Sequence, residues 1–238
     1  MANIPIIKTY NAKIIKIKQE TSSVKTYTIN LNGEIDFFPG QFVMAELKKI
    51  LPGTKRAYSI SSSPLEKKTI TITIKAVGLF SNEMAKRKEG DEITILGPIG
   101  HFMIKPEMKE DFVFMAAGCG ITPFLGMIDY TLKKMENKIN LFYSSKTPDE
   151  FIFLNEFDAF AKNKQFKAVY TATRCTDPNW KGYCERINPE MIKKELPDYK
   201  KKLYFLCGPL PFVEGLTETL KGIGVDEKNI KVEKWGTG

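Results

Sequence analysis

The chain has 238 residues, of which 42% are hydrophobic and 27% are charged, and its formal net charge is +8. This composition is typical of a globular protein with one large domain or two modest ones. No apolar run reaches the roughly 18 residues that a membrane span needs, and the opening MANIPIIKTY has no apolar signal-peptide core. We therefore expect a cytoplasmic protein with no membrane span.

The lysines are dispersed, and no nucleic-acid-binding motif accompanies them. The positive charge is either a solvated surface or an attraction for an acidic partner. The four cysteines are widely separated and form no C-x2-C pair, and His101 is the only histidine. These residues predict no metal centre and no iron–sulfur cluster in this chain.

The first hundred residues alternate apolar and polar side chains in short runs separated by turn residues such as FPG, LPGTK and KEGD. This pattern predicts an antiparallel β-barrel or sandwich. One short helix is expected within it, over residues 81–88, with Ser81 as its N-cap. The expected strands cover residues 11–20, 24–31, 41–47, 69–77 and 91–98.

After residues 105–110, apolar strands alternate with amphipathic helices. Repeated strand–helix units predict a parallel sheet with helices on both faces, as in nucleotide-binding domains. We therefore expect a β-barrel domain over residues 1–106 and an α/β domain over residues 107–238. The expected strands cover residues 112–118, 139–145, 166–173, 202–208 and 229–235; the expected helices cover residues 123–135, 150–163, 189–196 and 211–224.

The barrel half contains a candidate site for a planar ligand that carries a phosphate. In RAYSISSS, Arg56 and Tyr58 share one face of a strand and Ser59 faces the other way. The arginine can neutralise a phosphate and the tyrosine ring can pack on a planar ligand. The alternative is a surface arginine and a core tyrosine that bind no ligand. In VGLFSNEM, Gly78 and the helix start at Ser81 offer backbone amides to a pyrophosphate.

The α/β half contains a candidate dinucleotide site. In FVFMAAGCGITPF, a strand, two glycines and a helix occupy the usual position of a dinucleotide phosphate, with Pro123 in place of a third glycine. Cys119 is interpreted as a small residue in a tight loop rather than a reactive thiol. Cys207 ends a later strand in FLCGPLPF, where it either faces a ligand or is simply buried.

Eight segments in this order resemble the ferredoxin–NADP reductase superfamily of flavoproteins: FFPGQFV, RAYSISS, VGLFSNEM, GPIGHF, AAGCGITPF, LFYSSKTPDEFIF, LCGPLPFVEGL and KVEKWG. The resemblance implies an antiparallel flavin-binding barrel, a Rossmann-like NAD(P)-binding domain and an active site where the two meet. It also implies FAD in preference to FMN.

The resemblance assigns residues to each cofactor. The flavin contacts would be Arg56, Tyr58, Ser59, Ile74, Gly78, Leu79, Phe80 and Ser81. The nicotinamide nucleotide contacts would be Gly118, Gly120, Ile121, Thr122, Thr173, Arg174, Cys207, Gly208 and Pro209, with Trp235 closing the site. The catalytic residues would be Ser59, Cys207 and Glu233. Thr173 and Arg174 resemble the pair that holds the 2′-phosphate of NADP, so NADP is preferred to NAD.

The resemblance implies hydride transfer between NAD(P)H and FAD and single-electron exchange with an acidic carrier such as ferredoxin or flavodoxin. Two alternatives stay open. One is a free-flavin or haem-protein reductase of the same fold, and the other is a non-catalytic electron-transfer subunit of a larger complex. The sequence indicates neither the physiological acceptor nor the oligomeric state.

Overall fold

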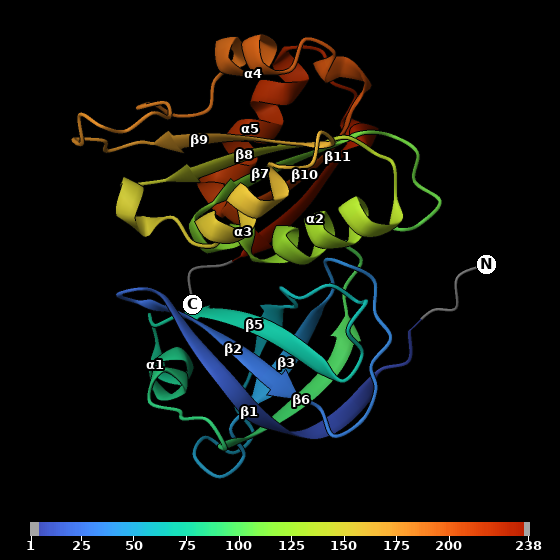
Figure 1. Cartoon of the computed structure of the whole chain (residues 1–238), viewed down its shortest axis with the longest axis vertical. Helices are drawn as coiled ribbons and strands as arrows, with labels where there is room; N and C mark the ends of the chain where they lie inside the picture. The colour runs from blue at the N-terminus through green and yellow to red at the C-terminus, as the bar shows by residue number, and fades with distance from the viewer. Residues whose placement is uncertain (1–4, 236–238) are drawn as a thin grey trace. The chain divides into compact units, whose positions relative to one another are not determined.

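The computed structural model describes residues 5–235, which divide into two compact units (Figure 1). One unit holds residues 5–106 together with Thr122–Tyr130, and the other holds residues 107–121 and 131–235. Helix α2, Thr122–Lys134, therefore contributes to both units. The division into domains at residues 106 and 107 remains a prediction.

The first unit is built on a six-stranded antiparallel sheet in the order β4-β3-β6-β1-β2-β5. A backbone bridge between Ile60 and Ile72 joins the two edges of this sheet, so the strands close into the predicted barrel. Alternate residues of the strands, such as Ile70, Ile72 and Ile74, are buried inside it. The strands are β1 Lys8–Thr21, β2 Val24–Asn30, β3 Phe42–Glu46, β4 Lys55–Ser59, β5 Thr69–Lys75 and β6 Glu92–Ile99.

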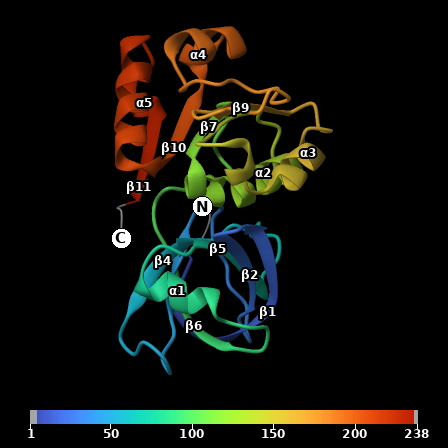
Figure 2. The same ribbon diagram turned by 90° about the vertical axis from the view of Figure 1, so that its left-hand side faces the viewer.

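Helix α1, Leu79–Ala85, lies beside the barrel strands and begins two residues before its predicted start (Figures 1 and 2). Its N-cap is Gly78, so the expectation that Ser81 caps it is wrong. Ser81 occupies the third helical position instead, and its Oγ accepts hydrogen bonds from the backbone N–H groups of Val77 and Gly78, both at 2.9 Å. The serine side chain reaches back over the helix start, as the last residue of a capping box does.

The second unit is built on a five-stranded parallel sheet in the order β11-β10-β7-β8-β9. Helices α4 and α5 cover one face and α3 covers the other, as predicted (Figures 1 and 2). The strands are β7 Phe112–Ala117, β8 Ile139–Ser145, β9 Phe166–Ala172, β10 Leu203–Pro209 and β11 Ile230–Trp235; the helices are α3 Leu154–Phe160, α4 Pro189–Glu195 and α5 Leu210–Gly222.

The inner strands β7, β8 and β10 of this sheet are buried on both faces. Val113 and Met115 of β7 belong to the hydrophobic cluster that includes Met191 and Ile192 of α4 and Val213 of α5. Phe112 and Phe114 point the other way, where Phe205 packs against both at centroid distances of 5.9 and 5.7 Å. Continuous apolar strands of this kind are expected in a parallel sheet that is covered on both sides.

Helix α3 is shorter than predicted, because its first expected residues are not helical. Phe151, Ile152 and Phe153 are three consecutive buried residues, and a surface helix cannot bury three neighbours on one face. Phe153 adopts a left-handed backbone with φ of 64°, and the helix begins after it. The Phe151 ring lies 4.8 Å from Tyr143 and stacks on Trp180 at 5.3 Å, so tertiary packing sets this boundary.

Candidate functional site

The strand order of the second unit creates a switch point between β7 and β10. From β7 the chain runs outward through β8 and β9, then returns to place β10 and β11 on the other side of β7. Ligands of open α/β sheets bind beyond the carboxyl ends of the strands at such a point. The residues at these ends are the 3₁₀ turn Gly118–Ile121 after β7 and the stretch Cys207–Pro209 of β10.

The turn after β7 approaches β10 so closely that only glycine fits at its centre. A Cβ added to Gly120 would lie 2.2 Å from the carbonyl oxygen of Cys207 and 2.7 Å from the Cα of Gly208. Gly118 has a left-handed φ of 53°, and a Cβ there would meet no atom within 4 Å. The structure therefore brings Gly118, Gly120 and Ile121 together with Cys207 and Gly208, and leaves the backbone of Gly118 open to a ligand.

Helix α2 begins directly after this turn, with Thr122 as its first residue. Pro123 lies in its first turn, where a missing N–H costs little. The side chains of Thr122 and Ile121 are both buried, whereas Gly118 is partly exposed. A phosphate at this helix start would therefore be held by backbone groups.

Cys207 and Glu233 are neighbours across the β10–β11 pair, where they are register partners. The side chain of Cys207 is fully buried and that of Glu233 is mostly buried. Within the described residues, Oε2 of Glu233 is buried without a hydrogen-bond partner. Burial raises the pKa of this carboxyl to about 7. An unpaired buried carboxyl that titrates near neutral pH is a candidate for a proton-handling or ligand-binding group.

Pro209 is exposed at the end of β10. The backbone of Trp235 pairs with Pro209 in the sheet register, but its side chain lies outside the described part of the structure. The predicted closure of the site by Trp235 therefore remains a prediction.

Ser145 at the carboxyl end of β8 is a further candidate that sequence reasoning missed. Its Oγ is buried and, among the described residues, has no hydrogen-bond partner. Its carbonyl oxygen accepts a hydrogen bond from the backbone N–H of Thr173 at 3.0 Å. The signal for it was the pair of serines that ends the apolar run INLFYSS.

Thr173 and Arg174 follow β9 and are held to the end of β8 by their backbones. The N–H of Arg174 donates to the carbonyl of Lys146 at 2.7 Å, while its side chain is exposed. A pocket of about 450 Å³ lies along the neighbouring edge of the sheet, lined by aromatic and lysine side chains that sequence reasoning did not select. They include Tyr170, Trp180, Tyr183, Lys167 and Lys181.

The first unit contains the predicted flavin residues of β4. Arg56 is exposed, and its guanidinium donates a hydrogen bond to the carbonyl of Lys55 at 2.9 Å. The Tyr58 ring is half-buried and lies 6.1 Å from that of Phe80, and burial raises the pKa of Tyr58 to about 12. Ser59 is buried. An exposed guanidinium beside a partly open aromatic ring can accept a phosphate and a flat ring system.

The segment around Gly78 adds backbone donors and exposed apolar surface to this unit. The amides in the first turn of α1 have no helical partner, and a Cβ added to Gly78 would meet no atom within 4 Å. Leu79 is 68% exposed, whereas Phe80 and Ile74 are buried in the barrel core. The side chains of Phe80 and Ile74 are therefore placed to shape the barrel wall, and these two residues could reach a ligand only through their backbones.

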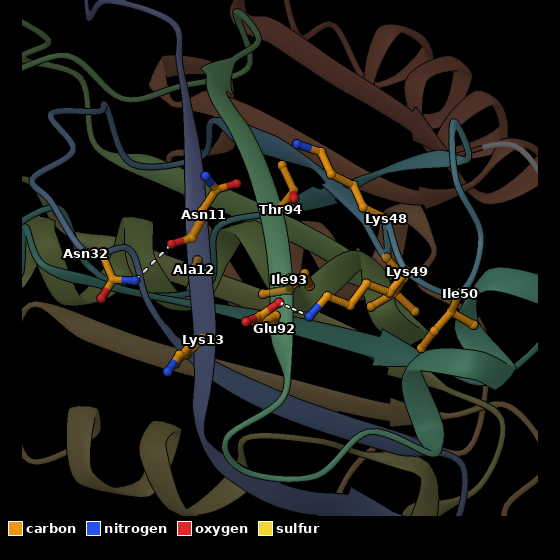
Figure 3. A pocket seen from close by; sticks show the side chains of 11 residues that line it. Asn11, Ala12, Lys13, Asn32, Lys48, Lys49, Ile50, Glu92, Ile93 and Thr94 are labelled. Carbon is orange, nitrogen blue, oxygen red and sulfur yellow. Dashed lines mark hydrogen bonds and ion pairs between the residues drawn. The ribbon is translucent and has the colours of Figure 1, made fainter.

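The barrel has another pocket, of about 390 Å³, that contains none of the predicted site residues (Figure 3). Lys13, Lys48 and Lys49 line it, and Nζ of Lys49 lies 2.7 Å from Glu92. This ion pair is exposed, and Lys49 lowers the pKa of Glu92 through a hydrogen bond and its charge. The pocket is a solvated surface feature rather than a built site.

Two family models match the chain in the order of the two units. An oxidoreductase FAD-binding domain matches residues 11–104, and an oxidoreductase NAD-binding domain matches residues 114–218. The chain belongs to the ferredoxin–NADP reductase-like superfamily. This superfamily pairs a domain for FAD with a domain for a nicotinamide dinucleotide, which agrees with the expected cofactors.

Curated relatives from this superfamily include reductases of several systems. The glycine betaine monooxygenase reductase subunit of Pseudomonas aeruginosa is 32% identical over 94% of this chain and 63% of its own length. The ferredoxin–NAD(P)(+) reductase CarAd of Metapseudomonas resinovorans is 26% identical over 95% of this chain and 69% of its own length. The chain thus spans less than two thirds of the length of the first of these proteins.

Solved structures share the fold. The cytochrome P450 reductase GcoB of Amycolatopsis matches with a TM-score of 0.88 at 19% identity, over 98% of this chain and 71% of its own. A ferredoxin NADP+ reductase of Neisseria gonorrhoeae with bound FAD and NADP matches with a TM-score of 0.79 at 24% identity, over 96% and 98%. Within residues 5–235, no helix has the length and apolar character of a membrane span, and no three metal-ligating side chains cluster.

Proposed function

We propose that this chain is a flavin-dependent oxidoreductase. It would transfer hydride between NAD(P)H and FAD, and single electrons to or from an acidic carrier such as ferredoxin or flavodoxin. The observation that carries the proposal is the glycine turn packed on Cys207 and Gly208 at the switch point of the sheet, in a chain that also matches an FAD-binding domain. A cytoplasmic location stays a prediction.

The barrel residues would hold the flavin. Bound FAD would supply two-electron exchange with a nicotinamide and one-electron exchange with a carrier. Arg56 would neutralise the phosphate, Tyr58 would pack on the ring system, and Ser59 would contact the flavin near its reactive nitrogen. The backbone of residues 78–81 would donate to the phosphate or pyrophosphate, and the exposed side chain of Leu79 would cover apolar parts of the cofactor.

The residues at the switch point would position the nicotinamide nucleotide. Gly118, Gly120, Ile121 and Thr122 would receive the phosphates, while Cys207, Gly208 and Pro209 would lie under the nicotinamide ring. These groups would contribute orientation, because a reaction between two rings depends on holding them in line. Glu233, whose pKa is raised to about 7, would hold or release a proton at Oε2 beside Cys207.

NADP is proposed as the preferred dinucleotide. Arg174 is exposed on a backbone that is anchored to β8, so its guanidinium can receive a 2′-phosphate that NAD does not have. The pocket along β9, with its aromatic and lysine side chains, offers surfaces on which an adenine ring could pack.

The carrier is proposed to be acidic. The net charge of +8 would favour encounter with a negative protein. Several relatives are named as reductase subunits of oxygenase or demethylase systems, which agrees with a chain that passes electrons to another protein. Rates with such a carrier should fall steeply as salt is raised, because screening shortens the range of surface charges.

The test begins with the visible spectrum of the purified protein, before and after anaerobic addition of NADPH or NADH. A yellow protein that NADPH bleaches faster than NADH supports the proposal; a colourless protein that takes up no flavin when supplied with excess contradicts it. Reduction of free flavin without tight flavin binding would favour the free-flavin reductase, and turnover only with partner subunits would favour the electron-transfer subunit.

Cys207→Ser tests the placement of the dinucleotide site. We expect this variant to bind flavin normally and to lose rate in the bleaching reaction, whereas Cys184→Ser, which changes an exposed thiol, should keep the rate under reducing conditions. Equal rates for Cys207→Ser and the wild type would show that Cys207 does not act at the reacting rings.

A further inference from the structure

Helix α2 has a glycine in its interior, at a position where alanine would give a more stable helix. Gly126 is the fifth residue of Thr122–Lys134, so it caps neither end of the helix. Glycine in a helix interior is unfavourable because it loses more backbone entropy on folding than any other residue. The reason for a glycine here therefore lies in what packs against the helix.

The space around Gly126 is closed by backbone. A Cβ added there would lie 2.4 Å from the carbonyl oxygen and 3.0 Å from the carbonyl carbon of Ser62, and 3.3 Å from the carbonyl oxygen of Ser61. Carbon and oxygen atoms in contact are normally about 3.3 to 3.6 Å apart, so alanine at this position requires a displacement of about 1 Å. Gly215 in the interior of α5 differs, because a Cβ there would meet no atom within 4 Å.

Ser61 and Ser62 belong to residues 60–62, which close the barrel and are here called the closing segment. The N–H of Ser61 donates to the carbonyl of Thr71 at 2.9 Å, and the N–H of Thr71 donates to Oγ of Ser62 at 3.0 Å. The backbone bridge that joins the two sheet edges lies next to these bonds. The closing segment directly follows β4, which carries the proposed flavin contacts.

Helix α2 is also anchored on the barrel by its own side chains. The rings of Phe124 and Phe102 lie 6.0 Å apart. Met127 is buried, and its methyl group lies 2.1 Å from the position of a Cβ added to Gly40. All of these contacts fall within the first unit. Because the packing on both sides is dense, a displacement at Gly126 is shared between the closing segment and the first half of the helix.

The first half of α2 directly follows the dinucleotide turn. Gly120 in this turn makes the same kind of backbone contact, since a Cβ added to it would lie 2.2 Å from the carbonyl oxygen of Cys207. Residues 120–126 thus run from a backbone contact at the proposed nicotinamide site to a backbone contact at the segment that follows the proposed flavin residues.

We propose that Gly126 is a positioning residue for hydride transfer, because its missing side chain sets how closely α2 approaches the closing segment. This inference rests on the proposed function. Gly126 acts through the backbone of Ser61 and Ser62. A side chain there moves the start of α2 relative to the flavin residues of β4, and a misplacement of about 1 Å lowers the rate of such a reaction roughly 100-fold. Both cofactors still bind, because the residues proposed to hold each of them are unchanged.

The first experiment needs neither cofactor. Hydrogen exchange of flavin-free protein, read by mass spectrometry, measures the protection of the peptides that contain residues 59–63 and 121–127. We expect faster exchange in at least one of these peptides in Gly126→Ala, and wild-type exchange in Gly215→Ala. Unchanged protection of both peptides in Gly126→Ala would contradict the displacement.

The second experiment separates binding from hydride transfer. Anaerobic stopped-flow measurement on FAD-loaded protein uses whichever of NADPH and NADH bleaches the wild type faster, and gives a limiting rate and a Kd. We expect Gly126→Ala to lower the limiting rate about 100-fold and to leave the Kd values for FAD and the nicotinamide nucleotide close to those of the wild type. Flavin that is first reduced with dithionite should be reoxidised by ferricyanide equally fast in both proteins, since this reaction needs no nicotinamide.

The double variant Gly126→Ala/Gly215→Ala separates positioning from stability. Alanine at Gly215 stabilises α5 without contacting the barrel, so the double variant should unfold at a higher urea concentration than Gly126→Ala and keep the low limiting rate. A rate that recovers with stability, a double variant that cannot retain FAD, or a wild-type limiting rate in Gly126→Ala would each overturn the proposal. A wild-type protein that binds FAD but is bleached by neither NADPH nor NADH would instead refute the proposed function.

Discussion

Glu233 provides the sharpest quantitative test, because one oxygen of its carboxyl is buried without a hydrogen-bond partner within residues 5–235. Oε2 has no hydrogen-bond partner among the described residues, and burial raises the pKa of the group from 4.5 to about 7. The folded protein therefore binds a proton more tightly at this site than the unfolded chain does. The free energy of unfolding should fall as pH rises through the window from 4.5 to about 7.

The size of the effect follows from the pKa difference. At roughly 1.4 kcal/mol per pKa unit, ionising this carboxyl in the folded state costs about 3 kcal/mol once the pH exceeds 7. Below about pH 4.5 the group is protonated in both states, and the cost disappears. Glu233→Gln keeps the shape of the protonated side chain and removes the ionisation. The variant should match the wild type at low pH and exceed its stability by about 3 kcal/mol at about pH 8.

The assay is urea unfolding of flavin-free protein from about pH 4.5 to about pH 8, reported as the difference between Glu233→Gln and the wild type. Glu136→Gln, which changes an exposed carboxylate, is the matched control and should give a flat difference within about 0.5 kcal/mol. A flat difference for Glu233→Gln as well would refute the reasoning, because it would mean that the carboxyl is solvated in the folded protein.

Three other variants test separate parts of the structure. Gly120→Ala should lower the free energy of unfolding by at least about 2 kcal/mol, because its Cβ would overlap the carbonyl of Cys207; Gly215→Ala, where a Cβ meets nothing, should be neutral or stabilising in the same urea titration. Arg56→Ala should weaken FAD binding about tenfold or more in a fluorescence titration with little loss of stability, and unaltered affinity would remove Arg56 from the flavin site. Lys202→Ala should cost about 1 kcal/mol in urea unfolding, since it removes the ion pairs of Nζ with the partly exposed carboxylates of Asp111 and Asp198 at 2.8 and 2.6 Å; no measurable loss would contradict that role.

Most of the fold could be predicted from local pattern. The alternation in KTYNAKIIKIK and TITITIK specifies which strand faces enter the barrel, and the apolar run FVFMAA specifies a strand buried on both sides. The structure contains these predicted strands because the free energy of burying a whole strand face outweighs the conformational preference of any single residue. The order of strands and helices then restricts the second unit to a parallel sheet with few possible topologies.

Two helix starts differ from the prediction, one because of a local hydrogen bond and the other because of tertiary packing. SNEM reads as a capped helix start, but the Ser81 hydroxyl bonds backwards to Val77 and Gly78 and so lies inside the helix. EFIFLNEF reads as one helix, but the rings of Tyr143 and Trp180 draw Phe151 out of it. Tyr143 lies on the preceding strand and Trp180 lies far along the chain, so the helical periodicity of this segment could not indicate the break.

Some residues of the candidate site could likewise be predicted from the sequence, whereas their contacts could not. Gly118, Gly120 and Cys207 could be selected from the sequence because glycines and a strand end carry a local signal, independent of their neighbours. Two features depend on chain crossings that only the folded sheet defines: Gly120 lies against the backbone of Cys207, and Oε2 of Glu233 is buried on the neighbouring strand without a hydrogen-bond partner among residues 5–235. The sequence alone determined the strands and helices and their order, because these follow from local periodicity. The tertiary structure decided which site residues lie close together and which are buried, because both depend on residues far apart along the chain.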